Sequence, residues 1–98
     1  MKEFSSSGCD AIYNERKRQV EEEHYDESHD KNETIENLIW ASAAYTTGCH
    51  RFWPWDYKYF KPGYLSVNGI RRDLVKAGAL IAAAIDKIDR GETSELEP

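Results

Sequence analysis

The strongest pattern in the chain is a repeat of apolar residues at every third or fourth position in its last third. From about Gly69 to Arg90 the apolar positions of this repeat are Ile70, Leu74, Ala77, Ile81, Ala84, Ile85 and Ile88. Such spacing predicts an amphipathic α-helix with one apolar face. Ser66 or Asn68 is suited to cap the start of this helix, and Gly91 is suited to end it.

Two further helices are predicted in the first half of the chain. Helix-forming residues extend from about Asp10 to Glu23, where only a weakly apolar face is present. From about Lys31 to Thr47 an inner stripe consists of Ile35, Leu38, Ile39, Ser42, Tyr45 and Thr46. Asp30 followed by Glu33 fits a capping box at the start of that helix, and Gly48 fits its end.

Residues 52–64 connect the second and last predicted helices and contain seven of the twelve aromatic residues of the chain. Pro54 and Pro62 interrupt the helical hydrogen-bond ladder there, although a short helical turn from about Trp55 to Phe60 is compatible with them. Such a segment either folds back as a connecting loop that fills the core, or it presents a stacking surface for a flat ligand such as a nucleobase. The sequence leaves both interpretations open.

These elements predict an all-α fold, a small three-helix bundle with an aromatic-rich connecting segment. We expect a disordered lead-in at residues 1–8, a single helical domain at 9–91 and an acidic disordered tail at 92–98. Because the first helix is polar and a short chain buries a limited core, we expect oligomerisation to complete the bundle. The predicted contact between copies is the flat small-residue face of the last helix, formed by Gly78, Ala79, Ala82 and Ala83.

The overall charge and the apolar runs narrow the class of partners. A net charge of −5 argues against non-specific nucleic-acid binding. No apolar run is long enough to span a bilayer, and the N-terminal residues lack the apolar core of a secretory signal. We therefore expect a cytoplasmic protein without membrane contact, in which Cys9 and Cys49 are two reduced thiols by default. Their spacing does not require a disulfide, and that alternative stays open.

Three cations stand at or just after the predicted start of the last helix, namely Arg71, Arg72 and Lys76. A helix N-terminus attracts phosphate, and arginine adds a planar fork that binds phosphate through two hydrogen bonds. Because the aromatic segment ends a few residues earlier, we predict a base site and a phosphate site side by side. The alternative is that these residues serve packing and surface charge.

Carboxylates three residues apart occur twice, in the pairs Glu33 with Glu36 and Asp86 with Asp89. Helical nucleotide pyrophosphohydrolases use two such pairs to hold Mg²⁺ against a triphosphate. With Asp73, these are the predicted metal ligands if the protein is an enzyme. Paired acids are also common on solvated helix faces, and that interpretation is favoured. A further group of potential ligands, which matches no zinc signature, is formed by His24, Asp26, His29 and Asp30.

Several runs of residues stand together in a familiar order. They are Glu15-Arg16-Lys17-Arg18-Gln19, His29-Asp30, Trp53-Pro54-Trp55 and Arg72-Asp73-Leu74-Val75-Lys76-Ala77-Gly78-Ala79-Leu80. Over roughly residues 15–90 the chain thereby resembles a family of small phage and prophage proteins. That family is related to dATP/dGTP pyrophosphohydrolases of the all-helical MazG-like kind. Its pattern usually has glutamates at the positions of Asn37 and Ala84, so the resemblance favours binding over metal-dependent hydrolysis.

The resemblance implies a nucleotide-binding protein in the cytoplasm of an infected or lysogenic bacterial host. In the favoured interpretation it is a sponge that sequesters an immune signalling nucleotide, of the cyclic dinucleotide or cyclic ADP-ribose type, without turnover. This interpretation assigns no catalytic residue and no cofactor. The ligand-binding residues that it predicts are Arg16, His29, Trp53, Trp55, Tyr57, Arg71, Arg72 and Lys76.

Two alternatives from other classes remain open. One is a Mg²⁺-dependent nucleoside triphosphate pyrophosphohydrolase of the MazG-like class. Its metal ligands are drawn from Glu33, Glu36, Asp73, Asp86 and Asp89. The other is a structural or protein-interaction module with an aromatic core.

Overall fold

The computed structural model of the protein describes residues 4–22 and 33–92, and within these ranges it contains helices and turns but no strand. Three α-helices follow one another along the chain: α1 (Ser7–Glu22), α2 (Ile35–Thr47) and α3 (Val67–Asp89). Two short 3-10 turns, η2 (His50–Phe52) and η3 (Tyr57–Tyr59), lie in the connection between α2 and α3. The predicted all-α fold of three helices is therefore confirmed. None of the described helices is long and apolar enough to cross a membrane.

Local caps set both ends of α2. Its first turn is capped by Thr34, whose hydroxyl accepts a hydrogen bond from the backbone N–H of Asn37 at 3.0 Å. The predicted start at Lys31 is therefore wrong, because this threonine competes successfully for the capping position. The predicted capping box at Asp30 lies outside the described residues. Gly48 ends the helix with a φ of 71°, in the left-handed region that glycine favours, as predicted.

Serine residues cap the other two helices. Ser66 caps α3, because its hydroxyl accepts a hydrogen bond from the backbone N–H of Gly69 at 2.9 Å. Of the two predicted caps, the serine is therefore the one that is used. Ser6 accepts a hydrogen bond from the backbone N–H of Cys9 at 3.2 Å, and α1 begins at Ser7, inside the predicted lead-in. The remaining parts of the two predicted disordered ends, residues 1–3 and 93–98, lie outside the described residues.

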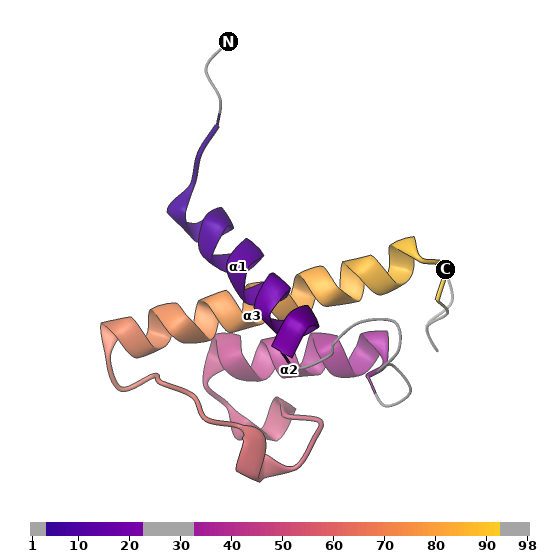
Figure 1. Cartoon of the computed structure of the whole chain (residues 1–98). Coiled ribbons are helices and arrows are strands. Elements are labelled where there is room, and N and C mark those ends of the chain that lie inside the picture. The colour runs from indigo at the N-terminus through magenta and orange to yellow at the C-terminus, as the bar shows by residue number, and fades with distance from the viewer. Residues whose placement is uncertain (1–3, 23–32, 93–98) are drawn as a thin grey trace.

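α1 and α2 both pack on α3, which is the central element of the fold (Figure 1). α2 runs alongside α3, whereas α1 crosses it. The core between α2 and α3 consists of Ile35, Leu38, Ala41, Tyr45, Ala77, Leu80, Ala83 and Ala84. Alanines supply half of this core, and their small side chains let the two helices approach closely. On the α1 side, Ile12 rests on Gly78, where a Cβ atom would lie 2.5 Å from the Ile12 Cδ1 atom.

The periodic isoleucines of α3 do not face this core. Ile70, Leu74, Ile81, Ile85 and Ile88 are each 44–57% exposed. The buried residues of the helix are Ala77, Ala79, Leu80, Ala83 and Ala84, among others. An apolar period shows that a helix is amphipathic, but the closest helix packing is reached through the smaller residues. The prediction of a contact between copies through the small-residue face is therefore wrong. Ala79 and Ala83 are buried within the chain, and Ile12 covers Gly78.

The aromatic segment packs against the core through three of its rings. Trp53, Trp55 and Phe60 are partly buried against it. Trp53 makes an edge-to-face contact with Tyr45 at 5.5 Å between ring centroids and another with Trp55 at 5.1 Å. The structure thus supports the core-filling interpretation for these rings. The helical turn predicted from Trp55 to Phe60 is shorter, since η3 spans three residues and is capped by Asp56.

The end of the aromatic segment is held tightly against the start of α3. The backbone N–H of Gly63 donates hydrogen bonds to both carboxylate oxygens of Asp73, at 3.0 and 2.8 Å. Asp73 is buried, and its carboxylate therefore serves as an internal anchor for the connection. The backbones of Gly63 and Gly69 lie so close together that neither position has space for a Cβ atom. This anchor determines where the first turn of α3 is placed.

Candidate anion-binding cleft

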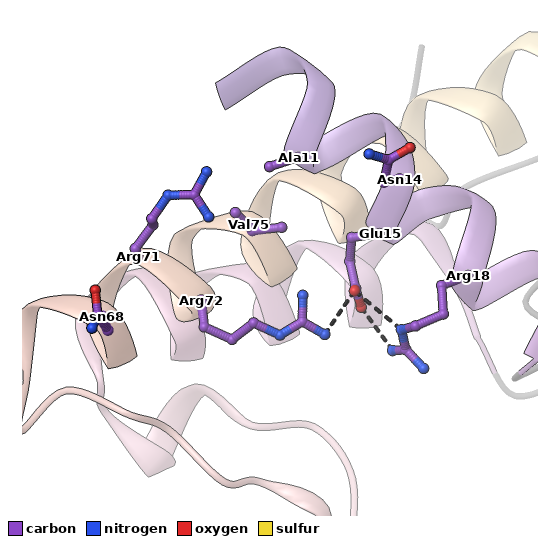
Figure 2. Close-up of a pocket in the computed structure, with 8 residues that line it drawn as sticks. All are labelled: Ala11, Asn14, Glu15, Arg18, Asn68, Arg71, Arg72 and Val75. Atoms are coloured by element: carbon purple, nitrogen blue, oxygen red, sulfur yellow. Dashed lines mark hydrogen bonds and ion pairs between the residues drawn. The ribbon is translucent and has the colours of Figure 1, made fainter. Parts of the chain in front are cut away.

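A cleft of about 530 Å³ lies between α1 and the first half of α3 (Figure 2). Its volume falls in the range of roughly 300–1,000 Å³ that is usual for small-molecule sites. The residues that line it are Ala11, Asn14, Glu15, Arg18, Asn68, Arg71, Arg72 and Val75. Three arginines against one glutamate leave this lining with a net charge of two positive, so the cleft is suited to an anion.

Glu15 organises the cationic side of the cleft. Its side chain is only 3% exposed, and its carboxylate accepts hydrogen bonds from Arg18 Nε at 3.1 Å and from a terminal nitrogen of Arg18 at 2.7 Å. A terminal nitrogen of Arg72 lies 2.7 Å from Glu15 Oε1, the oxygen that also accepts from Arg18 Nε. Figure 2 shows the two guanidinium groups converging on the carboxylate from α1 and α3. One buried anion therefore holds two arginines at fixed positions along the cleft wall.

The pKa of Glu15 reflects two opposing effects. Burial of the carboxylate acts to raise its pKa. The hydrogen bonds from Arg18 and Arg72, together with the positive charges of both residues, outweigh burial and hold the pKa of Glu15 below its usual value. The carboxylate is therefore ionised at neutral pH and keeps both arginines in place.

Arg71 differs from the other two arginines because it makes no ion pair with any residue in the described part of the chain. It lines the cleft, is exposed, and lies in the first turns of α3 next to Asn68 (Figure 2). The positive end of the helix dipole adds to its charge there. Its five N–H donors are thus available for a ligand.

The tryptophans and Tyr57, predicted to stack a base, do not line this cleft. Trp53 and Trp55 are engaged with the core, and Tyr57 is 60% exposed with its ring edge against His50. The structure therefore does not place the predicted base site beside the predicted phosphate site. The segment is adjacent to α3 in sequence, but it packs on the side of α3 that faces α2.

Two of the cationic residues that were predicted to bind the ligand make contacts outside the cleft. Arg16 Nε lies 3.0 Å from Asp86 Oδ2, which ties α1 to the second half of α3. The Lys76 ammonium lies 5.2 Å from the centroid of the Tyr45 ring, a cation–π contact that links α3 to α2. Burial, followed by the positive charge of Arg72, holds the pKa of Lys76 below its usual value. Neither residue lines the cleft, and the predicted ligand residue His29 lies outside the described residues.

The acidic residues predicted as metal ligands are not gathered in one place. Within residues 4–22 and 33–92, no three histidine, cysteine, aspartate or glutamate side chains come together as a metal site. Asp73 is used by the backbone of Gly63, and Asp86 is paired with Arg16. Asp89 is exposed at the far end of α3 from the cleft, while Glu33 and Glu36 lie at the start of α2. The predicted loop cluster around His24 falls outside the described residues.

Four polar residues of the cleft were not predicted from the sequence, namely Asn14, Glu15, Arg18 and Asn68. A signal for one of them is present, because Ile12, Glu15 and Gln19 are spaced as one helical face and the last two are buried. A buried glutamate needs a cationic partner, and Arg18 stands one turn further along. The contribution of Arg72 depends on how α1 crosses α3, which local spacing does not reveal.

Comparison with known proteins does not extend this description. No family model matches the chain, and neither a curated protein nor a solved structure matches it. The resemblance to MazG-like phage proteins therefore stays a prediction.

The two cysteines carry no disulfide in this structure, since Cys9 and Cys49 are both free thiols.

Proposed function

We propose that this protein binds a phosphorylated small molecule, a nucleotide in particular, in the cleft between α1 and α3 and releases it unchanged. The observation that carries this proposal is the guanidinium of Arg71, which makes no ion pair within residues 4–22 and 33–92, beside two arginines already held by Glu15. Two arginines held in place and a third that is not engaged by any described carboxylate favour a ligand with more than one negative oxygen. Phosphate groups meet that requirement, and arginine matches their geometry.

The remaining lining residues support a ligand that carries more than phosphate. Asn14 and Asn68 offer amide groups that both donate and accept hydrogen bonds, as the edges of a base or a ribose require. Ala11 and Val75 provide an apolar surface between the two helices. In this arrangement the base is bound by polar edges and an aliphatic wall, without the tryptophan stacking that the sequence favoured.

Sequestration is the role we propose for this binding, with a signalling nucleotide of the cyclic dinucleotide or cyclic ADP-ribose type as the ligand class. The cleft lining contains one carboxylate, and that carboxylate is occupied by Arg18 and Arg72. An ionised group engaged in this way is a poor general base, and it is a poor ligand for Mg²⁺. Binding without hydrolysis therefore agrees better with these contacts than the pyrophosphohydrolase alternative does.

One experiment separates the three classes of function. The full chain is incubated with a panel of linear and cyclic nucleotides in the presence of Mg²⁺, washed, and denatured by heat, and the supernatant is analysed by chromatography. We expect an intact nucleotide to be released. Recovery of pyrophosphate and a monophosphate would establish the hydrolase instead. Absence of both binding and turnover across the panel would leave the interaction module.

Arg71→Ala should weaken binding of the nucleotide recovered from that panel. Loss of one charge-assisted contact at an exposed position is expected to cost about 1–1.5 kcal/mol, roughly a five- to tenfold rise in Kd. Arg51→Ala is the matched control, because Arg51 is also an exposed arginine but lies in η2, away from the cleft. Titration calorimetry on both variants measures the difference. Equal affinities would remove Arg71 from the site.

A further inference from the structure

Five large aliphatic side chains form an exposed stripe along α3. The isoleucine stripe, as we call it, consists of Ile70, Leu74, Ile81, Ile85 and Ile88, each about half exposed. It extends over most of the 23 residues of the helix. Scattered apolar residues on a surface need no explanation, but a continuous apolar stripe on a small protein usually marks an interaction surface.

The isoleucine stripe occupies the part of α3 that neither neighbouring helix covers. At 3.6 residues per turn its members fall within a sector of roughly 60° around the helix axis. The residues to one side of it, Ala77 and Ala84, belong to the core shared with α2. On the other side Gly78 is covered by Ile12 of α1. A further helix can therefore pack against the stripe without displacing α1 or α2.

The stripe is complementary to itself when one copy is turned end for end. In an antiparallel pair centred between Gly78 and Ile81, Ile70 falls opposite Ile88 and Leu74 falls opposite Ile85. Ile81 of each copy then falls opposite the interval between Leu74 and Ile81 of the other copy, where the stripe has no large side chain of its own. This match follows from the spacing along α3, since the two residues of each pair lie at nearly equal distances on either side of the centre.

Charges beside the stripe favour the same orientation. Arg71 near the start of α3 and Asp89 near its end lie on the same side of the stripe, at the flanking positions that set orientation in paired helices. Both are exposed, and neither forms an ion pair among residues 4–22 and 33–92. Antiparallel packing brings each Arg71 opposite Asp89 of the partner subunit, whereas parallel packing would leave the two residues at opposite ends of the helix pair.

We propose that the isoleucine stripe is a self-association surface on which a second copy of this chain packs antiparallel, α3 against α3. The contact is isologous, as in most symmetric dimers, because the same residues are used on both sides. Arg71 stands at the boundary between the stripe and the cleft, and its planar group has donors enough for the partner's Asp89 and a ligand anion together. The proposal does not depend on ligand binding.

Light scattering coupled to size exclusion, run over a concentration series without nucleotide, tests the surface. We expect the wild-type protein to have about twice the chain mass of 11.3 kDa and Ile81→Lys to have the mass of one chain. Tyr59→Lys, which changes an exposed aromatic residue on η3, should still dimerise. A wild-type protein that stays at the mass of one chain, or an Ile81→Lys dimer, would overturn the proposal. Circular dichroism verifies that each variant is folded, and Ile85→Lys replaces Ile81→Lys if that variant is not.

A charge exchange tests the antiparallel orientation separately. Asp89→Arg should raise the dissociation constant of the dimer about tenfold or more, because it places arginine opposite arginine. Adding Arg71→Asp to the same chain restores opposite charges and should restore the wild-type dissociation constant. An Asp89→Arg protein that dimerises as tightly as the wild type, or a double variant that stays weak, would exclude the antiparallel pairing.

Discussion

Gly69→Ala is expected to lower the free energy of unfolding by about 3 kcal/mol or more. A Cβ atom at this position would meet the carbonyl oxygen, the carbonyl carbon and the Cα atom of Gly63. These are backbone atoms, which cannot rotate away as a side chain can, so the connecting segment must move as a whole. Overpacking of this kind costs roughly 1–3 kcal/mol.

Movement of Gly63 has a second consequence, because its N–H group donates to the buried carboxylate of Asp73. Weakening a hydrogen bond to a charged group adds roughly 1.5–3 kcal/mol. A domain of this size has a total stability of only about 5–15 kcal/mol. The thermal midpoint should therefore fall by more than about 10 °C, as measured by circular dichroism.

Gly8→Ala is the matched control for that variant. Its Cβ atom would lie 3.6 Å from the Ser6 hydroxyl oxygen, an ordinary contact, and Gly8 is helical. Alanine is the better helix former, so this variant should be as stable as the wild type or more stable by up to about 1 kcal/mol. If Gly69→Ala is no less stable than Gly8→Ala, the two glycines do not pack as described.

Glu15→Gln should change stability and ligand affinity in opposite directions. Loss of the carboxylate charge weakens the hydrogen bonds from Arg18 and Arg72. Because these side chains are 34% and 48% exposed and can be hydrated again, the expected loss of stability is about 1–2 kcal/mol. The same change removes the one negative charge from the residues that line the cleft, so a nucleotide should bind more tightly, by up to about tenfold.

The control for this variant is Glu22→Gln, which removes an exposed carboxylate that contacts Arg18 at 3.4 Å from outside the cleft. We expect little change in either quantity. Denaturant unfolding and titration calorimetry measure the two effects independently. Weaker nucleotide binding by Glu15→Gln would mean that the carboxylate itself contacts the ligand, which contradicts its assigned role as a holder of arginines.

The lowered pKa of Glu15 predicts how the free energy of unfolding decreases at acid pH. Since the pKa is lower in the folded protein than the usual value of 4.5, the unfolded chain binds the proton more readily. The stabilisation is complete above that unfolded value and disappears as pH falls through the lower pKa of the folded state. Glu15→Gln has no carboxylate to protonate and therefore lacks this contribution to stability. Its free energy of unfolding should decline less steeply than that of the wild type below about pH 4.5.

The candidate site shows which functional residues can be identified from their neighbours in the sequence and which cannot. Arg71 and Arg72 could be identified from the sequence because a cationic run at a helix start is a local feature. Their partner Glu15 lies on another helix, and its contact with Arg72 exists only because α1 crosses α3 at Gly78. The proximity of the tryptophans to these arginines in the sequence was misleading. The connecting segment turns toward α2 and carries Trp53 to Tyr45.

By itself, the sequence determined the three helices, a cap for α3 at either Ser66 or Asn68, the left-handed end at Gly48 and the aromatic character of the connection. All of these depend on residues within a few positions of one another. Only the tertiary structure decided which face of α3 is buried. Both its alanine face and its isoleucine face are apolar, and close packing against α2 and α1 selects the smaller side chains. That choice leaves the isoleucine stripe exposed and creates the arginine-lined cleft, because helix rotation and crossing are properties of the assembled core.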